Sequence, residues 1–168
     1  MTDTGANAVV DHIWEGVYSD FKDAPGTGGG FLGDEWLSNS EKKIRDLLAE
    51  TEGHSTVPSV TAYQSNLLPM VVALASSGSG KIRVLDFGGG PGITYVPVVA
   101  GMADGQNIDY HIVEVEQICR LGNDIFRDDD RIHFHSSLPS DIETADIVHL
   151  HSSLQYVEDW RGLVGKLA

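Results

Sequence analysis

Short apolar blocks alternate with amphipathic stretches from Lys81 to the end of the chain. An apolar run with period two or without polar breaks indicates a strand, and apolar residues at a 3.6-residue period indicate a helix. We predict strands over 82–87, 109–114, 131–136 and 146–151, helices over 92–101, 116–127 and 158–167, and a short helix or loop near 139–145. Strands that alternate with helices form right-handed crossovers, so the pattern predicts an α/β fold with a parallel sheet.

The first 80 residues show helical periodicity only. Apolar residues at every fourth position, from Val9 to Phe21, predict a short helix over 9–21. Ser38-x-x-Glu41 has the form of a capping box and predicts a helix that begins there and ends near Gly53. We therefore expect an N-terminal helical extension or cap over 1–80, followed by a Rossmann-like core over 81–168.

Two further features complete this N-terminal part. Asn66 is placed to cap a second helix that runs to about Ser76, with Pro69 in its first turn, where a missing N–H costs little. Pro25–Gly30 is glycine-rich, but no strand precedes it and no Gly-Lys-Ser/Thr follows. It is therefore expected to be a linker rather than a phosphate loop.

Composition limits the class of partner. The net charge is −14, from 25 acidic and 11 basic residues. Such a surface repels nucleic acid and anionic lipid, which favours a small-molecule substrate. No apolar run reaches the roughly 20 residues of a membrane span, and the N-terminus lacks the features of a secretory signal. We therefore expect a cytoplasmic protein. Cys119 is the only cysteine, which excludes an intrachain disulfide.

The segment after the first predicted strand carries the clearest chemical signal. Asp86 ends that strand, and Gly88, Gly89, Gly90 and Gly92 follow it before the next helix. Glycines at a strand-to-helix turn let a ligand approach the backbone, and the helix N-terminus adds unpaired N–H groups. Glu114 ends the next strand, where a carboxylate can accept hydrogen bonds from ribose hydroxyls. The spacing favours a nucleotide-type site over a turn needed only for packing.

The position of Asp86 narrows the class of ligand. An acid two residues before the glycines would repel a pyrophosphate but suits a cationic amino group. The pattern Asp86-x-Gly88-x-Gly90-x-Gly92 resembles the first motif of class I S-adenosylmethionine-dependent methyltransferases. That resemblance covers about residues 81–160 and implies S-adenosylmethionine as cofactor, held by Asp86 and the glycine loop, with Glu114 on its ribose. It also implies that the loop after the third strand faces the adenine, through Ser136, Ser137 and Leu138.

A narrower resemblance extends over nearly the whole chain. The segments IWEGVYSDFKDA (13–24), VLDFGGGPGITYV (84–96) and HSSLQYVEDW (151–160) are similar to a family of bacterial proteins to which methyltransferase activity is assigned from their fold. Some members of that family occur with surface-polysaccharide genes. The resemblance implies a methyltransferase that acts on a small-molecule or saccharide-type acceptor.

The tip of the fourth strand is the expected place of methyl transfer. His151 stands there as a candidate general base. The residues expected to line the substrate pocket or the methionine end of the cofactor with it are Ser152, Ser153, Gln155 and Tyr156. The alternative is that His151 caps the strand or packs beneath the cofactor. Because a sulfonium is already a strong electrophile, positioning of the acceptor matters more than acid–base help.

We predict no metal site. His133 and His135 alternate on one strand, and His149 and His151 on another, so each pair points to one face of the sheet. In the expected strand order 3-2-1-4 these two strands are three inter-strand steps apart, or roughly 14 Å at about 4.8 Å per step. That distance is too long for one ion, and no third ligand is evident near either pair.

The usual methyltransferase sheet has seven strands, and four are predicted here. Strand four would be an apolar edge, which is a liability in water. A truncated chain, a homodimer or partner chain that covers this edge, or a shortened protein would each account for it. The alternatives to an active methyltransferase are a catalytically incomplete cofactor-binding or regulatory module and, more weakly supported, an NAD-type oxidoreductase.

Overall fold

The computed structural model describes residues 16–24, 33–51, 67–76, 80–102, 107–140 and 145–167. Two helices, α1 (Asp34–Thr51) and α3 (Leu67–Ala75), precede the first strand. Four strands then alternate with helices: β1 (Ile82–Phe87), α4 (Tyr95–Ala100), β2 (Ile108–Val113), α5 (Glu116–Ile125), β3 (Ile132–His135), β4 (Ile147–Leu150) and α6 (Trp160–Leu167). Two short 3-10 helices, η1 (Phe21–Asp23) and η4 (Leu154–Tyr156), lie near the two ends. The predicted α/β class is confirmed.

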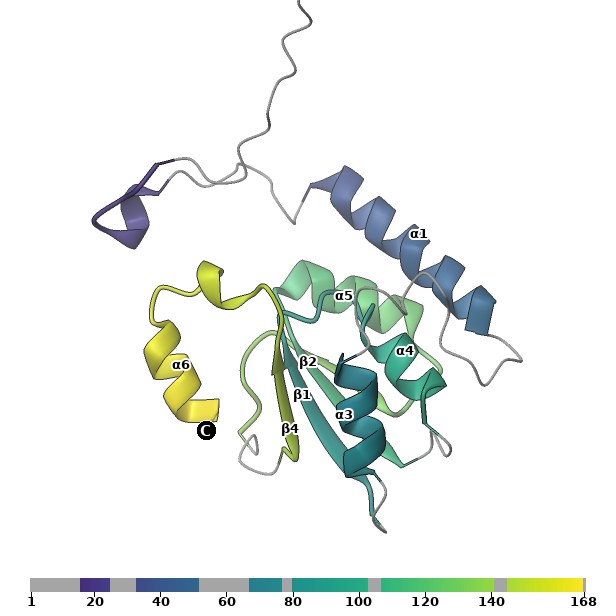
Figure 1. The fold of residues 1–168 in the computed structure, drawn as a ribbon. Helices are drawn as coiled ribbons and strands as arrows, with labels where there is room; N and C mark the ends of the chain where they lie inside the picture. Colours follow the sequence, from purple (N-terminus) through teal and green to yellow (C-terminus); the bar gives the residue numbers. More distant parts are fainter. Residues whose placement is uncertain are drawn as a thin grey trace, which may run out of the picture.

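The four strands form one parallel sheet in the order β3-β2-β1-β4. This is the Rossmann-like order that the methyltransferase resemblance implied. Figure 1 shows β2, β1 and β4 next to one another in this order. The chain moves from β1 to β2 to β3 in one direction and then returns to add β4 on the other side of β1. Ligands in such sheets bind at the carboxyl ends of the strands where the direction reverses, here between β1 and β4. Among the described strands, β4 is an edge strand, and a partner that covers it stays a prediction.

Apolar residues on one face of the sheet form the main core. Strand side chains alternate between faces, so Val84, Ile108 and Ile112 point to the same side and are fully buried there. α3 and α4 pack together over this core, and α1 contacts both α4 and α5 (Figure 1). Ile44 of α1 and Val72 of α3 belong to the same buried cluster as the strand residues. The described helices of the N-terminal part thus share a core with the sheet.

The predicted start of the first long helix is wrong. α1 begins at Asp34, and the N–H of Leu37 already donates to the carbonyl of Gly33. The Glu41 carboxylate accepts from Arg45 Nε at 2.9 Å, one turn further on, so it does not act as the acid of a capping box with Ser38. Ser38 therefore lies inside the helix rather than at its cap.

Two other predicted boundaries differ. Residues 16–20 are not helical, and only the short 3-10 turn η1 follows them, so the described part of the predicted 9–21 helix is wrong. The remainder of that prediction, the 25–30 linker and the Asn66 cap lie outside the described residues. α4 begins at Tyr95 rather than at position 92, because Gly92 has a φ of +102°, which no α-helix contains. In the described part of the chain we find no helix with the length and apolarity needed to cross a bilayer.

Candidate functional site

The glycine loop leaves the carboxyl end of β1 and turns back over it. Gly88, Gly90 and Gly92 have φ values of +76°, +61° and +102°, which residues with a side chain rarely adopt. The N–H of Gly88 donates to the Val113 carbonyl at 2.9 Å, which fixes the loop to the end of β2. A Cβ at Gly90 would meet no atom within 4 Å, so this part of the loop presents bare backbone to open space.

Asp86 lies directly beneath the loop and is 1% exposed. Its Oδ2 accepts hydrogen bonds from Thr94 Oγ1 at 2.6 Å and from the Tyr110 hydroxyl at 2.8 Å. Burial raises the pKa of Tyr110 well above its ordinary value, and the charge of Asp86 raises it further, so this hydroxyl stays a donor. Asp86 thus joins β1, β2 and the segment before α4 in one buried network.

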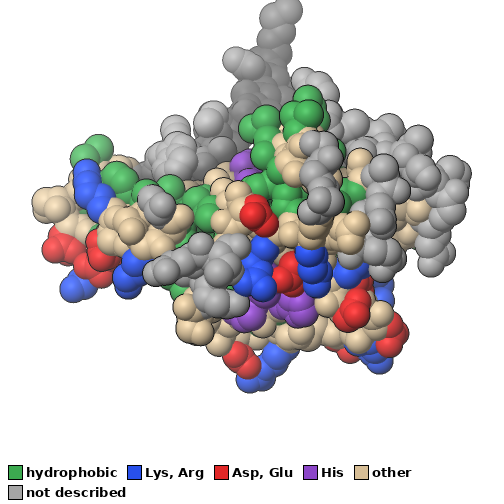
Figure 2. All heavy atoms as spheres, turned by 90° about the horizontal axis from the view of Figure 1, so that it is seen from below, with side chains coloured by type: hydrophobic (Ala, Val, Ile, Leu, Met, Phe, Trp, Pro, Cys, Tyr) green, Lys and Arg blue, Asp and Glu red, His purple; other side chains and the backbone are tan. Residues whose placement is uncertain are grey.

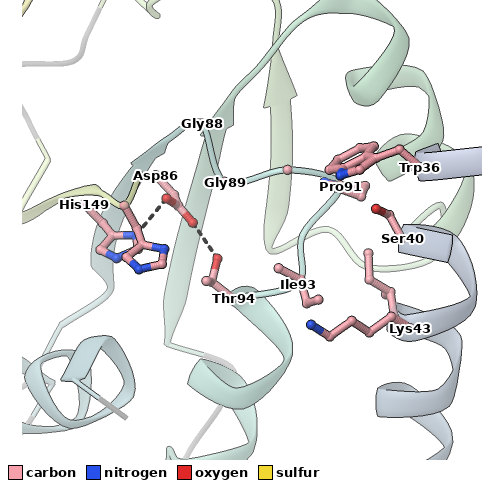
Figure 3. Close-up of a pocket in the computed structure, with 13 residues that line it drawn as sticks. Trp36, Ser40, Lys43, Asp86, Gly88, Gly89, Pro91, Ile93, Thr94 and His149 are labelled. Atoms are coloured by element: carbon pink, nitrogen blue, oxygen red, sulfur yellow. Dashed lines mark hydrogen bonds and ion pairs between the residues drawn. The ribbon is translucent and has the colours of Figure 1, made fainter. Parts of the chain in front are cut away.

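His149 provides the third contact of Asp86. Its Nδ1 lies 2.8 Å from Asp86 Oδ1, because Asp86 and His149 are register partners on neighbouring parallel strands (Figure 3). With the carboxylate as acceptor, Nδ1 carries a proton, so in the neutral imidazole the lone pair is on Nε2. The His151 ring stacks on the His149 ring at a centroid distance of 6.1 Å. The structure therefore pairs His149, which was not among the predicted site residues, with an orienting carboxylate.

A cavity of about 280 Å³ opens between the glycine loop, the end of β4 and α1. It lies at the reversal point between β1 and β4, where ligands of such sheets bind. Asp86, His149 and His151 line one wall. Trp36, Ser40 and Lys43 line the other, and they point from α1 toward the loop around Pro91 (Figure 3).

Glu114 contacts the other side of the glycine loop. Its Oε1 accepts from the Gly90 N–H at 3.2 Å, and its Oε2 accepts from the Val115 N–H at 2.9 Å. Burial raises the pKa of Glu114, the two backbone N–H groups oppose that rise, and the charge of Asp86 adds to it. The predicted ribose acid and the predicted glycine loop are thus brought into direct contact, although Glu114 does not line the cavity.

The predicted adenine contacts and the predicted substrate contacts do not line the cavity. Ser136, Ser137 and Leu138 follow β3 at the same edge of the sheet, and Ser136 and Ser137 are exposed. None of the three lines the cavity. Gln155 Nε2 donates to the Ser152 carbonyl at 2.8 Å, and Tyr156 is 59% exposed, so the predicted substrate contacts also lie outside the cavity.

Ser153, which the sequence placed with Ser152, packs against the glycine loop. A Cβ at Gly88 would collide with the Ser153 side chain, so this glycine allows the segment after β4 to pack on the loop. Ser152 precedes it with a φ of +56°, which is uncommon for a residue with a side chain. Ser153 Oγ is buried and has no hydrogen-bond partner among the described residues. At the tip of β4, next to the glycine loop, a strained backbone at Ser152 is thus followed by a buried hydroxyl, that of Ser153, without a described partner.

The α1 residues of the cavity were not predicted from the sequence. The spacing of Trp36, Ser40 and Lys43, at i, i+4 and i+7, puts them on one helical face, and this signal is present in the sequence. This helical face carries both aromatic and polar residues, so the pattern alone does not show whether the face lines a ligand site or is exposed to solvent. His149 had a similar signal, its alternation with His151, but its contact with Asp86 depends on strand register.

Comparisons with known proteins give a weak structural likeness. No protein-family model and no curated protein matches it. Among solved structures it is similar to the mitomycin 7-O-methyltransferase MmcR, with a TM-score of 0.34 and 20% sequence identity. The match covers 74% of this chain and 36% of that one, so the chain spans little more than a third of MmcR. A TM-score this low carries no argument about activity, and the proposal below rests on the geometry of the site.

Proposed function

We propose that the chain binds S-adenosylmethionine and acts as a methyltransferase on a small-molecule or saccharide-type acceptor. The observation that carries the proposal is the glycine loop, which exposes bare backbone at Gly90 while the carboxylate of Glu114 contacts it. A backbone cradle beside an acid at the end of the next strand suits a nucleoside whose ribose hydroxyls donate to that acid.

The charges around the loop favour a cationic ligand over a dinucleotide. Asp86 lies beneath the loop and Glu114 beside it, and the loop itself contains no lysine or arginine. Two acids at this distance oppose the approach of a pyrophosphate, whereas a sulfonium and an amino group are attracted. Asp86 is the proposed partner of that amino group, although both of its oxygens already accept hydrogen bonds from the protein.

The proposed transfer places the acceptor near His149. When bound, S-adenosylmethionine supplies a methyl group attached to a sulfonium sulfur. An acceptor oxygen or nitrogen would attack the methyl carbon while the bond between this carbon and the sulfur breaks. Nε2 of His149 is the base that would take the proton from the acceptor, and Asp86 holds the ring through Nδ1. His151, stacked on His149, would shield this nitrogen from water. The candidate base thus moves from His151 to His149.

The size of the cavity supports a small acceptor. Its volume of about 280 Å³ lies just below the range of roughly 300–1,000 Å³ that small-molecule sites occupy. Trp36 offers an aromatic face for the adenine or the acceptor, while Ser136, Ser137 and Leu138 stay candidate adenine contacts. Ser152, Gln155 and Tyr156 stay candidate substrate contacts at the outer rim.

Titration calorimetry of the full chain tests the proposal. We expect binding of S-adenosylmethionine and of its demethylated product, no binding of NAD, and at least tenfold weaker binding of the product by Glu114→Gln. Glu116→Gln is the matched control, because Glu116 is exposed and pairs only with Arg120 at 3.1 Å among the contacts described. A folded chain that binds neither sulfur compound rejects the proposal.

Transfer is measured separately with labelled S-adenosylmethionine and a panel of hydroxyl and amine acceptors. His149→Gln should lower the rate while leaving the affinity for the demethylated product within about threefold. Product binding without transfer to any acceptor would favour the alternative of a cofactor-binding or regulatory module. Binding of NAD alone would favour the oxidoreductase.

A further inference from the structure

A second cluster of ionisable side chains lies on the opposite face of the sheet. Asp109 and His111 are on β2, and His133 and His135 are on β3. Because His111 and His133 are register partners and side chains alternate, all four point to the face that α4 does not cover. In the view of Figure 2, histidine side chains (purple) reach the surface among acidic and basic ones.

The atoms of this cluster converge on one point. Asp109 Oδ1 lies 3.2 Å from His111 Nε2 and 3.2 Å from His133 Nε2, and the three atoms all lie within 4.8 Å of one another. Ligands of a tetrahedral zinc ion, with bonds of about 2.0–2.1 Å, are spaced about 3.3 Å apart. Two of the three spacings therefore match those of zinc ligands, and the third, between the two histidine nitrogens, is at most 4.8 Å.

The hydrogen bonds around the cluster orient the ligand atoms. His111 Nδ1 lies 2.9 Å from His135 Nε2, so a proton on Nδ1 leaves the Nε2 lone pair directed at Asp109 and His133. His111 Nε2 is buried and faces Asp109 Oδ1 at 3.2 Å, in a geometry that does not make a hydrogen bond. A buried nitrogen in this position gains from a further group that pairs with it.

The two oxygens of the Asp109 carboxylate have different partners. Its Oδ2 accepts from Arg83 Nε at 2.9 Å, which holds the carboxylate from behind. Its Oδ1 faces the two histidines, and Lys81 Nζ approaches it only to 3.9 Å from a side chain that is 55% exposed. Lys81 is therefore free to swing toward solvent when another cation binds.

From this geometry we infer that Asp109, His111 and His133 form a binding site for a divalent transition metal of the zinc class. The donors are two imidazole nitrogens and one carboxylate oxygen, a set that suits zinc rather than calcium or magnesium. His133 is 40% exposed, which leaves the fourth position open to water or to a small ligand. The inference departs from the prediction of no metal site, which did not consider His111 and Asp109 as neighbours of His133.

The site is separate from the proposed cofactor cavity. Asp86 and His149 point to the α4 side of the sheet, whereas Asp109 and His133 point to the other side and lie one and two strands away from β1. Metal binding and cofactor binding can therefore be measured independently. The net charge of −14 also attracts dications to the surface.

Metal titration of the full chain, with zinc competed against a chromophoric chelator, tests the inference. We expect one zinc ion per chain and at least 100-fold weaker binding by His133→Gln, whose side chain is the most exposed of the three. His135→Gln should weaken binding by about 10–100-fold, because it removes the group that orients His111. His151→Gln is the matched control and should bind zinc as the parent does.

Two results would overturn the inference. One is a folded parent chain that binds no zinc in the presence of the chelator, which would leave the cluster as an arrangement of hydrogen bonds and charges only. The other is His133→Gln with the zinc affinity of the parent, which would place the metal elsewhere. Cobalt substitution provides a second readout, since four-coordinate cobalt should give visible absorption in the parent and lose it in His133→Gln.

Discussion

Gly90→Ala separates the conformational role of the glycine loop from its role as a ligand surface. Gly90 has a φ of +61°, and an alanine Cβ there would meet no protein atom within 4 Å. The substitution therefore creates no clash, and it retains the N–H that donates to Glu114. Its only cost to folding is the left-handed conformation, about 1–2 kcal/mol for a residue with a side chain.

The expected effect on binding is larger than this strain explains. The new methyl group would stand where the cofactor is proposed to lie against the backbone. We expect the free energy of unfolding of the apo protein to fall by about 1–2 kcal/mol. We expect the dissociation constant for S-adenosylhomocysteine to rise at least tenfold, which corresponds to about 1.4 kcal/mol. Denaturant unfolding measures the first quantity and titration calorimetry the second.

Gly80→Ala is the matched control, because a Cβ at Gly80 also meets no atom within 4 Å and its backbone is not left-handed. It should change neither quantity. Gly89→Ala should behave differently from both, since its Cβ would lie 2.5 Å from Asp86 Oδ2 and would disturb folding. Parental affinity in a folded Gly90→Ala protein would refute the placement of the cofactor on this loop.

Three further predictions follow from the same structure. Because burial raises the pKa of Glu114 above its ordinary value of 4.5, and because ribose hydroxyls favour the ionised acid, cofactor affinity should fall as pH drops through this raised pKa. The fall should approach tenfold per pH unit, and Glu114→Gln should abolish it; calorimetry from pH 7 downward that gives both proteins the same profile contradicts this role. Tyr110→Phe removes a buried hydrogen bond to a charged acceptor, so it should lower the free energy of unfolding by about 2 kcal/mol and the Tm by about 4–8 °C. A Tm within a degree of the parent would mean that Asp86 does not need this donor. Ile44→Ala should cost about 2–5 kcal/mol in a single unfolding transition, and a separate early transition for α1 would contradict the shared core.

The sheet could be predicted from the sequence because its signal is local. Each strand is a short apolar block, and the predicted boundaries of β1 to β4 agree with the structure within one residue at every end. The order 3-2-1-4 was expected from the resemblance to methyltransferases, because right-handed crossovers alone also allow other orders of parallel strands. The start of α1 could not be predicted this way. The spacing allows Glu41 either to form a capping box with Ser38 or to pair with Arg45, and in the structure it accepts a hydrogen bond from Arg45.

The site was only partly predictable, because its contacts join distant segments. The glycine loop and Glu114 are recognisable by spacing along the chain, and the structure brings them together. The partners of Asp86 come from the segment before α4, from β2 and from β4, and strand register decides that His149 rather than His151 reaches it. The register of β2 and β3 likewise places His111 beside His133.

The most direct test of the central claim is a crystal structure of the full chain with S-adenosylhomocysteine. We predict that the ribose hydroxyls lie within hydrogen-bond distance of the Glu114 carboxylate and that the backbone of Gly88–Gly90 follows the ligand. The sulfur end should point toward the cavity beside His149. A ligand bound elsewhere, with Glu114 still bonded only to Gly90 and Val115, would contradict the account.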